Sequence, residues 1–452
     1  FVDAWGIGDG EKLIDPILDS LFETAGAPRR ERLRALAAIP GVYVPSLYEC
    51  EYRGGKFSAI NPLDDAAPAS IHRAVEMDMD KCPIPPSFPI PIVESVSGKA
   101  AIEIMRGCPE GCRFCQAGYS YRPARVRGAK SIRDAAVWLA ASAGWDEITL
   151  QSLSALNHPD IARIFRELRE VLDPLRVSVA LPSLRMDALS RELAADIRRP
   201  RETSLTFAIE AGSGRLRDAI NKRVGEDDIF ATLDAALEAG WHKFKLYFMC
   251  GFAGETMDDL DETSALIRRI SARAKKAGGK RTSVHASMSV LVPKPVTPLA
   301  WQPMERPEVT VMKTARVARA VRDLKNVKFH WHDPDKSALE ALFSRGDRRM
   351  GYVLAAAHAR GVLPPTLSEG AFDASPWFEI CADESVYPPD VPPVDAEESL
   401  YGERPKDAPF PWSHIDYGIN EAWLARELRR FESGRPTPSC EEKCEYCGIA
   451  CG

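Results

Sequence analysis

The stretch Met105-Arg-Gly-Cys108-Pro-Glu-Gly-Cys112-Arg-Phe-Cys115 places three cysteines at C-x-x-x-C-x-x-C spacing. It follows a β-rich run directly, so the three thiols share one loop at the end of a predicted strand. Three thiolates on one loop can ligate three irons of a four-iron four-sulfur cluster and leave the fourth iron open. The alternatives are a zinc site, which would lack its fourth ligand, and plain buried thiols. The spacing favours the iron-sulfur cluster.

From residue 100 onward, short β-rich runs alternate with amphipathic stretches, a pattern typical of parallel strands joined by helices. Six strands are expected, at 100–105, 147–150, 177–181, 205–209, 244–249 and 284–292. The predicted fold class is α/β, a partial (β/α)6 barrel with a small N-terminal α/β remnant and a C-terminal extension. Active sites of such barrels lie at the carboxyl ends of the strands, where the cysteine loop falls.

Composition shifts divide the chain into three predicted regions. Residues 1–95 comprise an N-terminal remnant and a proline-rich linker, residues 96–305 the barrel, and residues 306–452 an extension that ends in four cysteines. The opening strand and glycine turn at 1–10 suggest the tail of a domain whose first part is absent.

Bulk properties exclude several classes of protein. The net charge of -6 gives no general attraction to nucleic acid. No run of eighteen apolar residues and no signal-peptide pattern occur, so we expect a cytoplasmic protein without a membrane partner. Eleven cysteines in a reducing compartment indicate metal or redox chemistry rather than disulfides.

The cysteine loop and the strand ends behind it resemble the radical S-adenosylmethionine (SAM) superfamily. The resemblance implies that the open iron chelates SAM, that a reductant such as flavodoxin or ferredoxin supplies an electron, and that SAM is then cleaved. Cys108, Cys112 and Cys115 would be both the cluster ligands and the catalytic residues. The positions that match its SAM-pocket segments are Phe114, Glu210, Gly212, Ser213, Gly251 and Gly254.

One segment departs from the superfamily pattern. After the second predicted strand the chain has Gln151-Ser152-Leu-Ser154 in place of a Gly-Gly-Glu-like motif. Ser152 or Ser154 could contact the SAM amino group through a hydroxyl instead. Arg185, after the third strand, could pair with the SAM carboxylate or could be a surface arginine.

More narrowly, the chain resembles an uncharacterised radical SAM family with an N-terminal cobalamin-binding-type domain. The matching stretches include Ile39-Pro-Gly-Val-Tyr-Val-Pro, Leu216-Arg-Asp-Ala-Ile-Asn-Lys and Arg345-Gly-Asp-Arg-Arg. Only the end of that domain would be present here, so the resemblance does not make cobalamin a cofactor of this chain.

Four further cysteines, Cys440, Cys444, Cys447 and Cys451, crowd the end of the chain. A terminus this short needs a crosslink or a metal to become ordered. Four thiolates can hold a second four-iron four-sulfur cluster or a zinc ion. Disordered or disulfide-linked thiols are the remaining alternative, and the second cluster is favoured.

The predicted function is SAM-dependent radical modification by a transferase-like enzyme. The reaction would be methylation or methylthiolation of a large substrate such as RNA or protein. The rivals are modification of a small metabolite and a cluster-bearing scaffold that does not cleave SAM. The altered second-strand segment is the only support for the scaffold.

Overall fold

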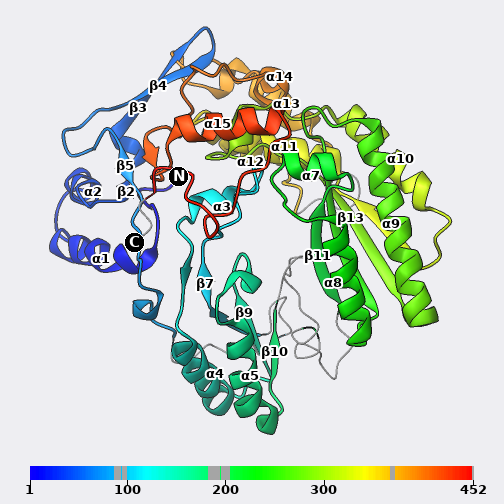
Figure 1. The fold of residues 1–452 in the computed structure, drawn as a ribbon. Helices are drawn as coiled ribbons and strands as arrows, with labels where there is room; N and C mark the ends of the chain where they lie inside the picture. The colour runs from blue at the N-terminus through cyan, green and yellow to red at the C-terminus, as the bar shows by residue number, and fades with distance from the viewer. Residues whose placement is uncertain (86–92, 94–98, 182–193, 195–203, 367–371, 450–452) are drawn as a thin grey trace.

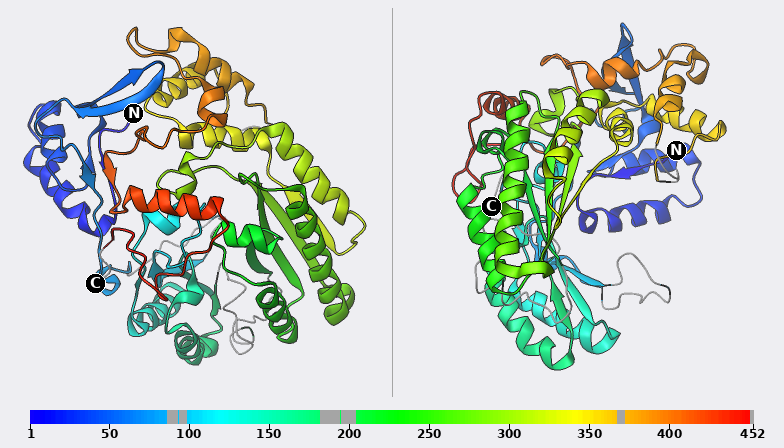
Figure 2. Two further views of the ribbon diagram at one scale, coloured as in Figure 1. Left: turned by 45° about the horizontal axis from the view of Figure 1, so that its top comes forward. Right: turned by 90° about the vertical axis from the view of Figure 1, so that its right-hand side faces the viewer.

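The computed structural model describes residues 1–85, 93, 99–181, 194, 204–366 and 372–449 (Figure 1). Two parallel sheets with helices packed on them make the body of the molecule. The N-terminal elements and the C-terminal helices gather at one end of this body (Figure 2). Among the described residues, no helix has the length and apolar character needed to cross a membrane.

The first parallel sheet carries the cysteine loop. It consists of β6 (Ala100–Glu103), β9 (Glu147–Gln151) and β10 (Ser178–Ala180), in the order β10–β9–β6. Two amphipathic helices, α4 (Ala129–Ala143) and α5 (Ile161–Leu172), connect the strands and bury their apolar sides in the core with them. The first three predicted strands are therefore present and parallel.

The second parallel sheet has the order β11–β12–β13–β14. Its strands are β11 (Leu205–Glu210), β12 (Lys243–Cys250), β13 (Ser283–Val290) and β14 (Val327–Trp331). Strand β14 pairs in parallel with β13, so part of the expected C-terminal extension continues the barrel sheet. The helices of this half are α7 (Gly214–Ala219), α8 (Glu226–Glu238), α9 (Met257–Gly278) and α10 (Pro307–Val321).

Sequence alternation explains why these strands face the core. In β13 the residues Val284, Ala286, Met288 and Val290 are buried, and the polar residues between them are half-buried. All strands of both sheets run parallel, so their carboxyl ends meet at one edge. The candidate site must lie there.

The N-terminal region packs against the C-terminal region. Strand β5 (Ile71–His72) pairs in parallel with β15 (Ile415–Asp416), which joins the two ends of the chain. An antiparallel hairpin, β3 (Tyr48–Arg53) with β4 (Lys56–Pro62), reaches the later helices. The other elements of this region are β1 (Trp5–Gly6), α1 (Ile14–Glu23), α2 (Arg29–Ala37) and β2 (Val42–Tyr43).

The helices after β14 form a second apolar core. Asp333 caps the first of them by accepting from the backbone N–H groups of Asp335 and Lys336. Arg345 is buried and donates to backbone carbonyls, including that of Gly402, so it ties the helices to the following chain. The helices of this core are α11 (Pro334–Arg345), α12 (Met350–Ala359), α13 (Ser375–Ala382) and α14 (Ala396–Tyr401). The last helix, α15 (Glu421–Glu432), packs in a separate core with Tyr119 and Trp301.

Candidate functional site

The cysteine loop is closed at its base and shaped by two glycines. Strand β7 (Met105–Arg106) enters the loop, α3 (Gln116–Ser120) follows it, and β8 (Arg125–Val126) pairs back on β7. Gly107 has φ +84°, and a Cβ there would lie 2.5 Å from the carbonyl oxygen of Tyr121. Gly111 has φ +72°, and its Cβ would lie 2.9 Å from Nη2 of Arg122. Only glycine fits this path without a shift of the chain.

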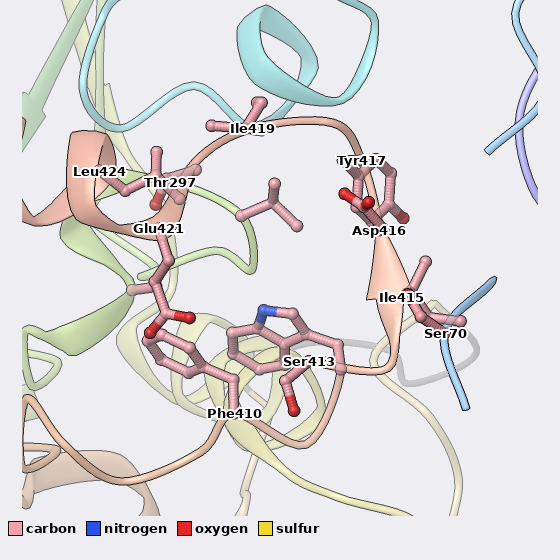
Figure 3. Close-up of a pocket in the computed structure, with 13 residues that line it drawn as sticks. Ser70, Thr297, Phe410, Ser413, Ile415, Asp416, Tyr417, Ile419, Glu421 and Leu424 are labelled. Carbon is pink, nitrogen blue, oxygen red and sulfur yellow. The ribbon is translucent and has the colours of Figure 1, made fainter. Parts of the chain in front are cut away.

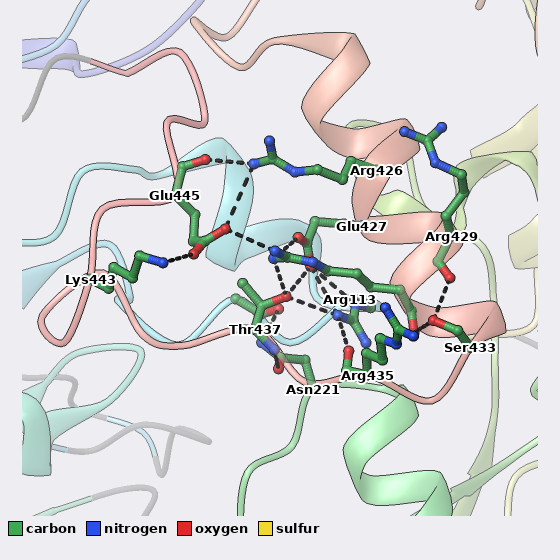
Figure 4. Close-up of polar contacts among 12 residues, drawn as sticks. Arg113, Asn221, Arg426, Glu427, Arg429, Ser433, Arg435, Thr437, Lys443 and Glu445 are labelled. Carbon is green, nitrogen blue, oxygen red and sulfur yellow. Dashed lines mark hydrogen bonds and ion pairs between the residues drawn. The ribbon is translucent and has the colours of Figure 1, made fainter.

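A buried arginine in the loop anchors it to the C-terminal helix. Arg113 is fully buried, and its Nη2 lies 3.1 Å from a carboxylate oxygen of Glu427 in α15. The same guanidinium donates to the carbonyl of Arg435 at 2.7 Å and to the hydroxyl of Thr437 at 2.9 Å (Figure 4). The segment between the second and third cysteines is thus fixed by residues more than 300 positions away in sequence.

Asn221 supports the other half of the loop. Its Nδ2 donates to the carbonyls of Glu110 and Gly111, and its Oδ1 accepts from the backbone N–H of Thr437. The Glu110 side chain accepts from Asn157 at 3.0 Å, and Asn157 in turn accepts from the hydroxyl of Ser154. Segments after β9 and β11 therefore both brace the loop.

The three loop thiols lie near one another in a partly buried setting. Burial, reinforced by Cys112 and Cys115, raises the pKa of Cys108 to about 12. Metal ligands must be deprotonated, so ligation here releases protons. Within the described ranges, no three His, Cys, Asp or Glu side chains are grouped as ligands of a single metal ion. Thiolates of a four-iron cluster bind separate irons, so they need not converge on one point.

The two serines after β9 differ in their hydrogen bonds. Ser152 Oγ is buried and has no hydrogen-bond partner among the described residues, and its predicted contact with SAM stays a prediction. Ser154 is buried but already donates to Asn157, so it supports the loop. Arg185 lies outside the described residues.

Glu210 ends β11 in an uncommon conformation. Its φ is +69°, in the left-handed region that non-glycine residues rarely occupy, and the β11–β12 register shifts beside it. Its carboxylate lies 3.3 Å from Nζ of Lys222, and both residues are buried. Backbone strain of this kind concentrates at functional sites, and the predicted contact of Glu210 with SAM stays a prediction.

Gly212 and Ser213 have packing contacts of their own. A Cβ on Gly212 would lie 2.1 Å from Cα of Thr263, so this glycine allows α9 to approach. Ser213 caps α7 by accepting from Leu216 N–H, and it donates to Asp259 at 2.5 Å. The predicted contact of these two residues with SAM stays a prediction.

The turn after β12 lies beside the cysteine loop. The rings of Phe252 and Phe114 are 6.2 Å apart, edge to face, so the turn and the loop present aromatic side chains to each other. Gly251 has φ +88° and donates its N–H to Glu255 at 2.8 Å. A Cβ on Gly254 would meet nothing within 4 Å, which leaves this part of the turn open.

A cavity of about 190 Å³ opens at the same end of the barrel (Figure 3). Val296 and Thr297, which follow β13, form one wall. The segment from Phe410 to Leu424 forms the other, and Glu421 points into the space. Pockets for drug-sized ligands are larger, so this cavity suits one base, one side chain or a small metabolite.

The C-terminal tail lies against the cysteine loop. The N–H of Cys440 donates to the carbonyl of Pro109 at 3.0 Å, one residue from Cys108. Cys440 and Cys444 are exposed and Cys447 is buried, and all three line one cavity of about 90 Å³. Cys451 lies outside the described residues.

The sequence around the cysteine loop matches a known protein family. Residues 102–267 match the family described as the radical SAM superfamily, and this range contains the cysteine loop and the ends of β6, β9, β11 and β12. This part of the chain is therefore similar to the radical SAM superfamily. The match implies an enzyme with a four-iron four-sulfur cluster and SAM, and the cysteine loop lies inside the matched residues.

The chain is similar to several proteins of known sequence or structure. It is 30% identical over 262 residues to an uncharacterized protein of Methanocaldococcus jannaschii, covering 58% of this chain and 55% of that protein. It is 27% identical over 187 residues to a tRNA-2-methylthio-N(6)-dimethylallyladenosine synthase of Chlorobium phaeobacteroides, covering 38% and 40%. The crystal structure of Streptococcus suis SuiB aligns with a TM-score of 0.35 at 10% identity, covering 55% and 54%. The chain spans about half or less of its curated relatives.

Several site residues were missed from the sequence. Arg113 and Arg122 are charged residues beside the loop, which local patterns assign to the surface, yet both are buried. Asn221 and Lys222 lie in the stretch 216–222, which was noted for its resemblance but given no role. An asparagine that can adopt positive φ was the available signal, because Asn221 has φ +57°.

Proposed function

We propose that this chain binds a four-iron four-sulfur cluster through Cys108, Cys112 and Cys115 and cleaves SAM reductively there. The radical would modify a macromolecular substrate such as RNA or protein, by methylation or methylthiolation. The observation that carries the proposal is the cysteine loop, which glycines, Arg113 and Asn221 hold at the carboxyl ends of the parallel strands. The transferase chemistry is supported by the likeness to a tRNA methylthio synthase.

When bound, the cluster supplies the electron that breaks a carbon–sulfur bond of SAM, with a protein such as flavodoxin or ferredoxin as donor. The chain's own residues orient and enclose the reactants. The buried hydroxyl of Ser152 would accept from the SAM amino group, and Phe114 with Phe252 would supply apolar surface beside the adenine. The Glu210–Lys222 pair holds the end of β11 in its left-handed conformation. The covering segment Phe410–Leu424 limits the access of water.

The small cavity between Thr297 and Glu421 would receive the group that is modified. Its volume of about 190 Å³ admits one base or one side chain of a macromolecule, and equally a small metabolite. A small metabolite is therefore the alternative substrate.

We further propose that Cys440, Cys444, Cys447 and Cys451 hold a second cluster. The described thiols Cys440, Cys444 and Cys447 line one cavity, and a zinc ion is the alternative occupant. Cobalamin is not part of the proposal.

The test is anaerobic reconstitution with iron and sulfide, followed by SAM and a low-potential reductant. We expect release of 5'-deoxyadenosine and its loss in the variant with Cys108, Cys112 and Cys115 changed to alanine. Equal product from that variant would refute the assignment. Mass spectrometry of RNA and protein from cells lacking the gene then separates the macromolecular substrate from the metabolite.

A further inference from the structure

The wall between the cysteine loop and the C-terminal tail contains a buried arginine that the reaction above does not use. Arg122 follows α3 and is only 4% exposed. Its Nε donates to the carbonyl of Gly118 at 2.9 Å. The guanidinium lies 5.2 Å from the ring centroids of Tyr119 and Trp423, so two aromatic faces hold it in place.

Among the residues that the structure describes, no carboxylate forms an ion pair with Arg122. Three carboxylates line the same cavity, and each binds another partner: Glu110 binds Asn157, Glu427 binds Arg113 and Glu445 binds Arg430. A buried guanidinium without a counter-charge is costly, so such a cation requires an anion from another source.

Arg122 shares a cavity with the described cysteines of the tail. Arg122, Cys440, Cys444 and Cys447 all line the cavity of about 90 Å³. The guanidinium of Arg122 and the three described thiols therefore border the same enclosed space.

The charge of a tetra-thiolate centre matches this environment. Four thiolates around a divalent zinc ion, or around an oxidised four-iron cluster, leave a net charge of about -2. Enclosing such a centre requires nearby positive charge. Lys443 also lines the cavity, but it is on the exposed tail and pairs with Glu445. Arg122 is the buried cation that comes from the barrel side.

We propose that Arg122 is the counter-charge of a metal–thiolate centre held by the C-terminal cysteines, and that it couples this centre to the loop of the SAM-cleaving cluster. The inference rests on the second metal site of the proposed function. The coupling is direct, because Nη2 of Arg122 lies against Gly111 and Cys440 bonds to Pro109. Arg122 is thus a positioning residue that contacts both sites.

The test uses the full chain with Cys108, Cys112 and Cys115 changed to alanine, so that only the tail can hold metal. Metal is loaded anaerobically as iron with sulfide, or as zinc, and its loss to EDTA is timed. We expect Arg122→Gln to lose metal roughly tenfold faster, because a unit charge a few ångströms from the centre is removed. Arg122→Lys should largely restore retention. Arg163→Gln, at an exposed arginine of α5, is the matched control and should behave as the parent.

A second readout excludes a merely structural effect. In the iron-loaded form, loss of the positive charge should shift the midpoint potential of the tail centre to a more negative value. Equal retention and equal potential in Arg122→Gln and the parent would overturn the role of Arg122 alone. If the parent of this series binds no metal at all, the second centre is wrong, and the inference falls with it. The SAM-cleavage assay on the unaltered chain is independent of both outcomes.

Discussion

The cysteine loop and the C-terminal tail carry similar sets of thiols, but the protein orders them very differently. Gly107 and Gly111 shape the loop, Arg113 within it donates to Ala219 and Glu427, and Asn221 donates to its backbone. The tail is held largely by charged side chains such as Arg223 and Arg430, and two of its three described cysteines are exposed. We therefore expect the loop to be preorganised for its cluster, and the tail to need the metal proposed for it to become fully ordered.

The strongest test of this difference removes the anchor of the loop. Glu427→Gln leaves the buried Arg113 guanidinium without its carboxylate. Loss of one partner of a buried ion pair costs about 3–5 kcal/mol of the free energy of unfolding. Urea denaturation should show this loss, together with lower iron retention by the loop. Glu432→Gln, at an exposed position on the same helix, should change stability by less than about 0.5 kcal/mol. Equal midpoints for the two variants would contradict the anchoring role.

The next largest effect is expected from substitutions at two glycines, which distinguish the cost of backbone strain from the cost of a steric clash. Gly107 and Gly254 both have positive φ, but only Gly107 would place a Cβ against backbone oxygens. Gly254→Ala should cost about 1 kcal/mol from the left-handed backbone alone. Gly107→Ala should cost about 1–3 kcal/mol more, because the chain must move. Thermal unfolding of the two apoproteins measures the difference, and equal losses would mean that the loop is not preorganised.

The same comparison explains what the sequence could and could not predict. The strands followed from alternating apolar residues, and they are parallel as expected. The cap at Asp333 follows from a local pattern and could be predicted in the same way. The contact between Arg113 and Glu427 spans 314 positions, and no local pattern reports such a pairing. A buried arginine also contradicts its usual surface preference, so its role becomes apparent only in the fold.

The number of strands shows a related limit. Strand β14 lies in residues 306–452, which were predicted from the sequence to form the C-terminal extension and not the barrel. In the structure it pairs along β13 from Val284 to Met288. The sequence of a short strand does not indicate which sheet the strand will join. Tertiary packing, rather than local propensity, makes that choice.

Removal of metal by EDTA should make the C-terminal tail more accessible to protease and leave the cysteine loop protected. If metal at ten times its dissociation constant orders the tail, chelation should accelerate local cleavage about tenfold. Trypsin cleavage after the exposed Lys443 reports the tail, and cleavage after the buried Arg113 reports the loop. Mass spectrometry of timed digests, with and without EDTA, gives both rates from one sample. Equal acceleration at the two sites would show that the loop depends on metal as much as the tail does.

The smallest expected effect is a pH dependence of stability at the start of the cysteine loop, where Arg106 binds Glu11. Arg106, the residue before Gly107, binds Glu11 of the N-terminal region at 2.9 Å. This hydrogen bond, chiefly, lowers the pKa of Glu11 from 4.5 to about 2. A carboxyl with a lowered pKa in the folded state adds stability above its unfolded value of 4.5. That stability is lost as the pH falls from 4.5 towards 2.

Glu11→Gln should therefore lower the urea midpoint at pH 7, and the difference from the parent should shrink as the pH approaches 3. Glu23→Gln, at an exposed position at the end of α1, is the control for removal of a carboxylate from the same region. A difference that stays constant between pH 7 and pH 3 would mean that the Glu11 charge does not stabilise the start of the loop. The glycines and the C-terminal helix would then preorganise the loop, and the Glu11–Arg106 contact with the N-terminal region would not contribute.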